Sequence, residues 1–186
     1  MDYLKKILLE MIPVVLGVLV ALFINNGKEH FDNQRFVNKV FKSIHQEMIA
    51  NQKEFDDVME RQYALIDTFK VYQDSSISIL DLLGKTNGLQ VPTVKNISWR
   101  SFLNSKIELI NFDCLSTLTD IDESKKILQL KVERLMDHLL GEVEATDSAS
   151  KRKLVIHTVN VIDSEKELAR LYKKYLSECA QNKAVD

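Results

Sequence analysis

The chain has 186 residues, of which 45% are hydrophobic and 28% are charged, with only five glycines and two prolines. This composition suits one helical domain with an anchor, and it excludes a disordered or collagen-like chain. The formal net charge of −2 gives no overall basic surface, so a nucleic-acid partner is not expected.

The first element is an apolar stretch from Ile7 to Ile24 in which Glu10 is the only charged residue. At about 1.5 Å per residue, a helix of this length approaches the roughly 30 Å hydrocarbon core of a bilayer. The stretch ends without the small-residue pattern of a signal-peptide cleavage site, and it lacks the polar face expected of a helix in a soluble core. We therefore expect an uncleaved transmembrane anchor over residues 1–26, in preference to a cleaved signal or a buried core helix.

One face of this helix combines polar ends with a small middle. Its residues are spaced four, three, four and four apart: Glu10, Val14, Gly17, Ala21 and Asn25. Small residues four apart let a second helix approach closely in lipid, so we interpret this face as a surface for membrane-helix association. Glu10 is interpreted as an interfacial residue, and the alternative is a proton-accepting carboxylate in an ion path.

The charges that flank the stretch leave its orientation open. Lys5 and Lys6 precede it, and four basic residues follow it: Lys28, Arg35, Lys39 and Lys42. A strict count of positive charges does not place the N-terminus inside. However, a very short basic tail directly before an apolar run is typical of a signal anchor, which favours an exported C-terminal domain.

The register Glu10, Gly17, Ala21, Asn25–Asn26 and Glu29 resembles the N-terminal anchor of an uncharacterised family of bacterial membrane proteins, known only as a domain of unknown function. The segment "SWRSFLNSKIELI", from Ser98 to Ile110, resembles a tryptophan-led helix and turn of that family. Gly27 departs from the family, which usually has a tryptophan there. The resemblance implies a single-pass protein of the bacterial inner membrane with a periplasmic helical domain. It implies no activity, substrate or catalytic residue.

A long stretch without glycine or proline follows, from Phe31 to about Gln73. Eleven of its positions alternate spacings of four and three and form a heptad seam, in which Asn51 and Gln62 are the polar members. The nine apolar or aromatic members are Val37, Phe41, Ile44, Met48, Phe55, Val58, Leu65, Phe69 and Tyr72. The pattern predicts one long amphipathic helix in a coiled coil or a bundle, and the further apolar helices favour the bundle. Gly27 is the only flexible residue where this helix joins the anchor, so we expect the two to be continuous.

The fold class predicted is all-α, with residues 27–186 forming one antiparallel helical bundle domain. Its further expected helices are Ser75–Leu83, Ser98–Asn104, Lys106–Leu118, Ser124–Glu144 and Ala149–Gln181, with a loop over Gly84–Asn96 and a turn over Asp120–Ser124. Trp99 and Phe102 are expected to face inward. The apolar side of the fourth of these helices is expected to comprise Ile127, Leu130, Leu135, Leu139 and Val143.

Residues that could carry chemistry are sparse. The four histidines, His30, His45, His138 and His157, form no HExxH motif and no i, i+4 pair, so solvated or capping roles are expected. The basic cluster Lys151–Lys153 is interpreted as a solvated face. Cys114 and Cys179 are expected to be ordinary helix residues, with a disulfide as the alternative in an oxidising compartment.

No phosphate-loop, dinucleotide-binding or nucleophile-elbow motif is present in the sequence. We therefore predict no catalytic, cofactor-binding or metal-binding residue and expect that the protein is not an enzyme. The predicted function is a membrane-anchored interaction or scaffold protein that forms a homo-oligomer or docks on a membrane-protein complex. Two alternatives stay open: an accessory subunit of an ion-driven or transport machine in which Glu10 titrates, and an exported bundle that senses a ligand.

Overall fold

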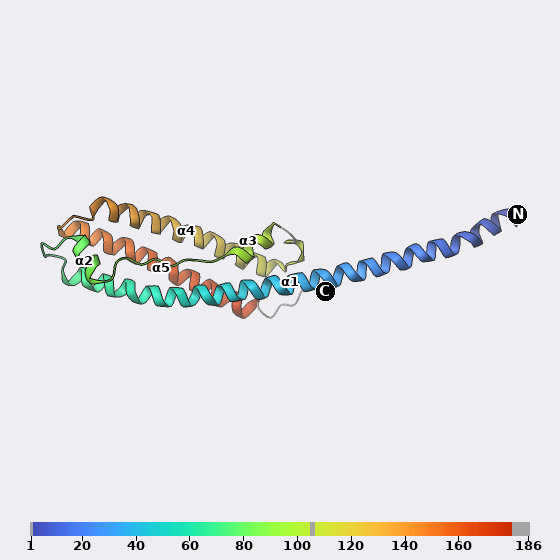
Figure 1. Cartoon of the computed structure of the whole chain (residues 1–186), viewed down its shortest axis with the longest axis horizontal. Helices are drawn as coiled ribbons and strands as arrows, with labels where there is room; N and C mark the ends of the chain where they lie inside the picture. The colour runs from blue at the N-terminus through green and yellow to red at the C-terminus, as the bar shows by residue number, and fades with distance from the viewer. Residues whose placement is uncertain (1, 105–106, 180–186) are drawn as a thin grey trace.

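The computed structural model describes the backbone of residues 2–104 and 107–179 and the side chains of residues 11–104, 107 and 109–179. These residues form helices and no strand, which confirms the all-helical prediction. The helices are α1 (Asp2–Val71), α2 (Ile79–Lys85), α3 (Ile97–Leu103), a short 3-10 helix η1 (Ile107–Leu109), α4 (Phe112–Glu142) and α5 (Ser148–Glu178). Figure 1 shows a long rod that projects from a group of helices.

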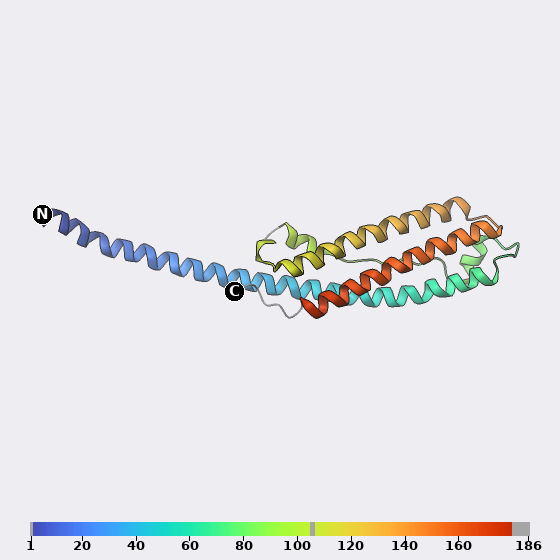
Figure 2. The same ribbon diagram turned by 180° about the vertical axis from the view of Figure 1, so that it is seen from behind.

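The rod is α1, which runs for 70 residues without a break. At 1.5 Å per residue it is about 105 Å long. Pro13 and Gly27 both lie within it, so the expected continuity of the apolar stretch and the amphipathic helix is confirmed. Its N-terminal part stands clear of the other helices, and its C-terminal part packs among them (Figures 1 and 2).

The other two long helices, α4 and α5, lie side by side along the C-terminal part of α1 (Figures 1 and 2). α5 packs against both α4 and α1. Stacked aromatic pairs join α1 to α5: the ring centroids of Phe55 and Tyr172 are 5.8 Å apart, and those of Phe41 and Tyr175 are 6.4 Å apart. Burial of these large rings supplies much of the apolar area that holds α5 in place.

A segment without regular structure, residues 86–96, connects α2 to α3 along the side of the long helices (Figure 1). We call it the strap. It begins with a reversal in which Asn87 and Gly88 adopt φ values of 58° and 84°. α3 then packs on α1, with Trp99 3% exposed and Phe102 fully buried, which confirms that both face inward.

The expected turn at Asp120–Ser124 is wrong, because α4 is one helix through these residues. Carboxylates and a serine do not force a break where glycine and proline are absent, and Asp122 instead forms an ion pair with Lys126 one turn later, at 2.9 Å. The start expected at Lys106 lies outside the described residues, but one helix from there to Leu118 is wrong. η1 (Ile107–Leu109) is separate, and α4 begins at Phe112 because the Asn111 side chain accepts a hydrogen bond from the Asp113 amide and caps the helix. The expectation that Ile127 and Leu130 belong to the apolar side of this helix is also wrong, because the two residues are 51% and 56% exposed.

The expected boundaries of the short helices shift for local reasons. α2 begins at Ile79 rather than Ser75, because the Ser78 hydroxyl accepts a hydrogen bond from the Asp81 amide and caps the helix. α3 begins at Ile97, and the amide and hydroxyl of Ser98 donate to the Glu47 carboxylate instead of capping. α5 begins one residue before its expected start and ends at Glu178.

Candidate functional site

The N-terminal part of α1 is one helix near the N-terminus that is long and apolar enough to cross a membrane. An 18-residue stretch of this helix has a mean hydropathy of 1.7, and none of that stretch is buried inside the protein. The large apolar side chains from Met11 to Ile24 are 49% to 81% exposed. A buried core helix, one of the alternatives for this stretch, is therefore excluded.

The residues of the predicted association face lie on this uncovered part of α1. Val14, Gly17, Ala21 and Asn25 are exposed, and a side chain built at Gly17 would meet no atom within 4 Å. The side chain of Glu10 lies outside the described residues. The face is thus free to receive another helix, and its association remains a prediction.

The heptad seam lies inside the protein. Seven of its apolar members are buried, at 5% exposure or less: Val37, Ile44, Met48, Phe55, Val58, Leu65 and Phe69. Phe41 and Tyr72 are half-buried, and Tyr72 follows the end of α1. The seam therefore packs on α5 and α3 of the same chain.

The polar members of the seam are also buried and connect α1 to the strap. The side-chain nitrogen of Asn51 donates to the backbone carbonyl of Lys95 at 2.7 Å, and the side-chain oxygen of Asn51 accepts from the backbone amide of Lys95 at 2.9 Å. It also donates to the hydroxyl of Tyr172 on α5 at 3.3 Å. Three turns farther along α1, Gln62 donates to the strap carbonyl of Gln90 at 3.0 Å and to the carboxylate of Glu165 on α5 at 2.8 Å. Asn51 and Gln62 thus each join α1, the strap and α5.

Glu165 is a fully buried carboxyl group on α5. Burial raises its pKa to about 7, opposed by the hydrogen bond from Gln62. The sequence pattern contained a signal for this residue, because Glu165 lies four residues after Val161 and three before Leu168, both of which are buried. An inward-facing glutamate is therefore deducible from the spacing, although its partner is not.

A small cavity of about 20 Å³ lies between α1, the strap, α3, α4 and α5 and is lined in part by Trp99 and Tyr172. The indole nitrogen of Trp99 has no hydrogen-bond partner among the described residues. A cavity of this size holds about one water molecule. It offers no room for a larger ligand in this conformation.

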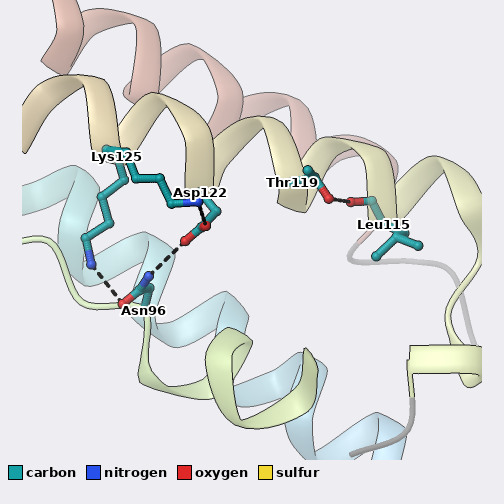
Figure 3. Close-up of polar contacts among 6 residues, drawn as sticks. Asn96, Leu115, Thr119, Asp122 and Lys125 are labelled. Carbon is teal, nitrogen blue, oxygen red and sulfur yellow. Dashed lines mark hydrogen bonds and ion pairs between the residues drawn. The ribbon is translucent and has the colours of Figure 1, made fainter. Parts of the chain in front are cut away.

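Three residues that line this cavity also form a polar tether between the strap and α4 (Figure 3). The Lys125 ammonium donates to the side-chain oxygen of Asn96 at 2.8 Å, and the Asn96 amide donates to Asp122 at 3.3 Å. Burial, with a contribution from the nearby Arg100, lowers the pKa of Lys125, and the charges of Asp122 and Glu47 oppose the shift. On the same helix, the Thr119 hydroxyl donates to the Leu115 carbonyl, which is an ordinary intrahelical contact (Figure 3).

Lys151 is buried, so the expectation that the cluster Lys151–Lys153 is a solvated face is wrong for this residue. Its side chain is fully buried, and its ammonium donates to the carbonyls of Tyr72 and Ser75 at 3.1 and 2.6 Å. Both carbonyls lie just beyond the C-terminal end of α1, which ends at Val71, and a positive charge near that end is stabilised by the helix dipole. Lys151 lies three residues before the buried Leu154, so its inward direction follows the apolar face of α5.

Two histidines that are distant in sequence meet across α4 and α5. The ring centroids of His138 and His157 are 5.2 Å apart, and both side chains are half-buried. Burial, followed by the charges of His138 and Arg134, lowers the pKa of His157. Within the described residues, no group of three or more side chains is arranged to hold a metal ion.

Cys114 and Cys179 form a disulfide, so the expectation of two ordinary helix residues is wrong. Their Cα atoms are 5.5 Å apart, within the range that a disulfide requires. The bond joins the first turn of α4 to the residue that follows α5. The pairing was not deducible from the sequence, since 65 residues separate the two cysteines and only the packing of α4 on α5 brings them together.

Comparison with models of protein families, with curated proteins and with solved structures finds no match to the chain. The resemblance of the N-terminal register to a family of bacterial membrane proteins therefore remains a prediction.

Proposed function

We propose that the protein is a non-enzymatic, single-pass membrane protein whose anchor carries an antiparallel helical bundle and brings it to other subunits as an interaction module or scaffold. The unbroken α1 carries this proposal. One helix contains both the exposed apolar stretch that ends at Ile24 and the core residues that begin at Val37. The membrane segment and the bundle are therefore mechanically one element.

The side chains that follow the apolar stretch suit a membrane surface. Phe31 is 63% exposed, and the guanidinium of Arg35 lies over its ring, 5.7 Å from the centroid. Phe31 comes about 10 Å beyond Ile24 along the helix, close to the depth of the lipid headgroups. An aromatic ring beside an arginine is favourable at that depth.

The disulfide supports an exported position for the bundle. Disulfides form and persist in oxidising compartments and are rare where thiols are kept reduced. Cys114 and Cys179 are paired and each is 1% exposed. For a protein of the bacterial inner membrane, the oxidising side is the periplasm, and we place the C-terminal domain there.

The first experiment is the mass and composition of the complex extracted from native membranes in mild detergent. A mass that is a multiple of 21.4 kDa supports a homo-oligomer, and a co-purifying membrane protein supports a partner complex. A lone chain in every mild detergent contradicts the proposed association.

A matched pair of variants tests the association face. Gly17→Leu fills the small position on that face, whereas Val15→Leu enlarges a side chain on the opposite side of the helix. We expect Gly17→Leu to lower the mass of the complex and Val15→Leu to leave it unchanged. An equal change of the mass in both variants, or no change in either, contradicts the role of this face.

A further inference from the structure

A buried polar joint connects three elements of the bundle at one level. The amide nitrogen of Gln62 on α1 donates to the Gln90 carbonyl of the strap at 3.0 Å and to one carboxyl oxygen of Glu165 on α5 at 2.8 Å. Gln62 is 1% exposed and Glu165 is fully buried. Because buried polar groups are costly when unpaired, every donor and acceptor in this joint has to be accounted for.

Two oxygen atoms of this joint have no donor. Among the described residues, neither the side-chain oxygen of Gln62 nor the second carboxyl oxygen of Glu165 has a hydrogen-bond partner. Exchanging the oxygen and nitrogen of the Gln62 amide does not help, because its nitrogen already donates both of its hydrogens. An ionised Glu165 accepts only, so the joint lacks one hydrogen.

A single proton on Glu165 supplies that hydrogen. A protonated carboxyl is both a donor and an acceptor, and a side-chain amide is the same. Gln62 and Glu165 then form a reciprocal pair in which the amide nitrogen donates to the carboxyl and the carboxyl hydroxyl donates to the amide oxygen. Both oxygens that lack a donor become satisfied in one step.

The charged groups on the surrounding elements do not replace this proton. On α1, Arg61 is exposed and donates to the side chain of Gln90. On α4, Lys126 is paired with Asp122, and Lys131 donates to a backbone carbonyl of α5. On α5 itself, Lys166 is exposed and lies over the ring of Tyr63.

The acidic neighbours of Glu165 on α5 are Asp163 and Glu167. Both are exposed, and Glu167 is paired with Arg170. The strap carries no charged residue between Gln90 and Val94. The pKa of Glu165, raised to about 7 by burial, agrees with a carboxyl that no cation stabilises.

We propose that the folded bundle binds one proton at Glu165, as a carboxyl–amide pair with Gln62, and that release of this proton loosens the joint between α1, the strap and α5. The bundle is thereby a proton-responsive device. This inference does not depend on the proposed scaffold function, because the joint lies wholly within the bundle. In an exported domain the device faces the pH of the medium rather than that of the cytoplasm.

The sign of the effect on stability follows from the direction of the pKa shift. Glu165 takes up its proton more readily in the folded than in the unfolded chain, so its contribution is fully present below the ordinary pKa of 4.5. The contribution is lost as the pH rises toward about 7. Within this window the unfolding equilibrium constant rises up to about tenfold per pH unit.

The test compares three full-length proteins in mild detergent: the wild type, Glu165→Gln and the matched control Glu167→Gln. A glutamine at position 165 keeps one donor and one acceptor toward Gln62 at every pH. We expect the unfolding equilibrium constant of the wild type and of Glu167→Gln to rise about tenfold per unit between pH 5 and 7 relative to Glu165→Gln. The same pH dependence in all three proteins overturns the proposal.

Two further readouts keep the proposal falsifiable if Glu165→Gln fails to fold. Infrared spectra of the wild type at pH 6 should contain the band of a protonated carboxyl, which should disappear as the pH is raised through 7 to 8. Hydrogen exchange, corrected for its intrinsic pH dependence, should show faster opening of the strap over the same range. Absence of the infrared band at pH 6 overturns the proposal, as does strap opening that does not change with pH.

Discussion

Removal of the Cys114–Cys179 disulfide should destabilise the bundle by an amount set by the length of chain that it closes. The two cysteines are 65 residues apart in sequence. In the chain-entropy model, a loop of about that length corresponds to roughly 4 kcal/mol at 25 °C, because the crosslink restricts the unfolded chain. The bond lies at the end of the α4–α5 pair opposite their connecting loop, so reduction should fray that end first (Figure 1).

The assay is denaturant unfolding of the full-length protein in mild detergent, with and without a reductant. We expect the free energy of unfolding to fall by about 4 kcal/mol on reduction. The double variant Cys114→Ala/Cys179→Ala is the control: it should be insensitive to the reductant and similar in stability to the reduced wild type. A loss below about 1 kcal/mol, or free thiols at both positions in protein taken from native membranes, would refute the reasoning.

Substitutions at three more residues, Lys151, Asn51 and His157, test polar groups of the folded chain. Lys151→Met removes the ammonium from the end of α1 and should lower the free energy of unfolding by about 3 kcal/mol. The control Arg152→Met replaces an exposed neighbour and should change that free energy by less than about 0.5 kcal/mol. Equal effects of the two variants would contradict the role of the Lys151 ammonium at the end of α1. Asn51→Leu removes the hydrogen bonds to the strap and should cost about 2 kcal/mol and accelerate hydrogen exchange at the Lys95 amide, and an unchanged exchange rate would contradict this contact. The lowered pKa of His157 means that the folded state binds its proton less readily, so His157 contributes stability that is lost as the pH drops below the ordinary value of 6.5, opposite in sign to the contribution of Glu165. The stability of the wild type relative to His157→Gln should therefore fall below pH 6.5, and identical pH profiles of the two proteins would contradict the lowered pKa.

The sequence predicted the longest element best. The stretch from Phe31 to Gln73 contains no residue that breaks a helix, and its apolar spacing is regular over many turns, so local preference and tertiary packing agree. The same spacing placed the seam residues, from Val37 to Phe69, on the face that the structure buries.

Turns and partners were harder to predict. The residues Asp120–Ser124 suit either a turn or a helix, and packing of α4 along α5 selects the helix. The contacts of Glu165 and Lys151 join positions that are 76 to 103 residues apart in sequence. Periodicity predicts that such residues face inward, but it does not contain the register between helices that decides which groups meet.

The side of the membrane on which the bundle lies can be measured with a peptide tag placed after Asp186. Spheroplasts of bacteria that produce the tagged full-length chain are treated with protease from outside, and a cytoplasmic protein serves as the marker of intact membranes. An anchor with an exported bundle predicts that the tag is removed while the marker survives. A tag that is protected until the spheroplasts are lysed would contradict the exported domain.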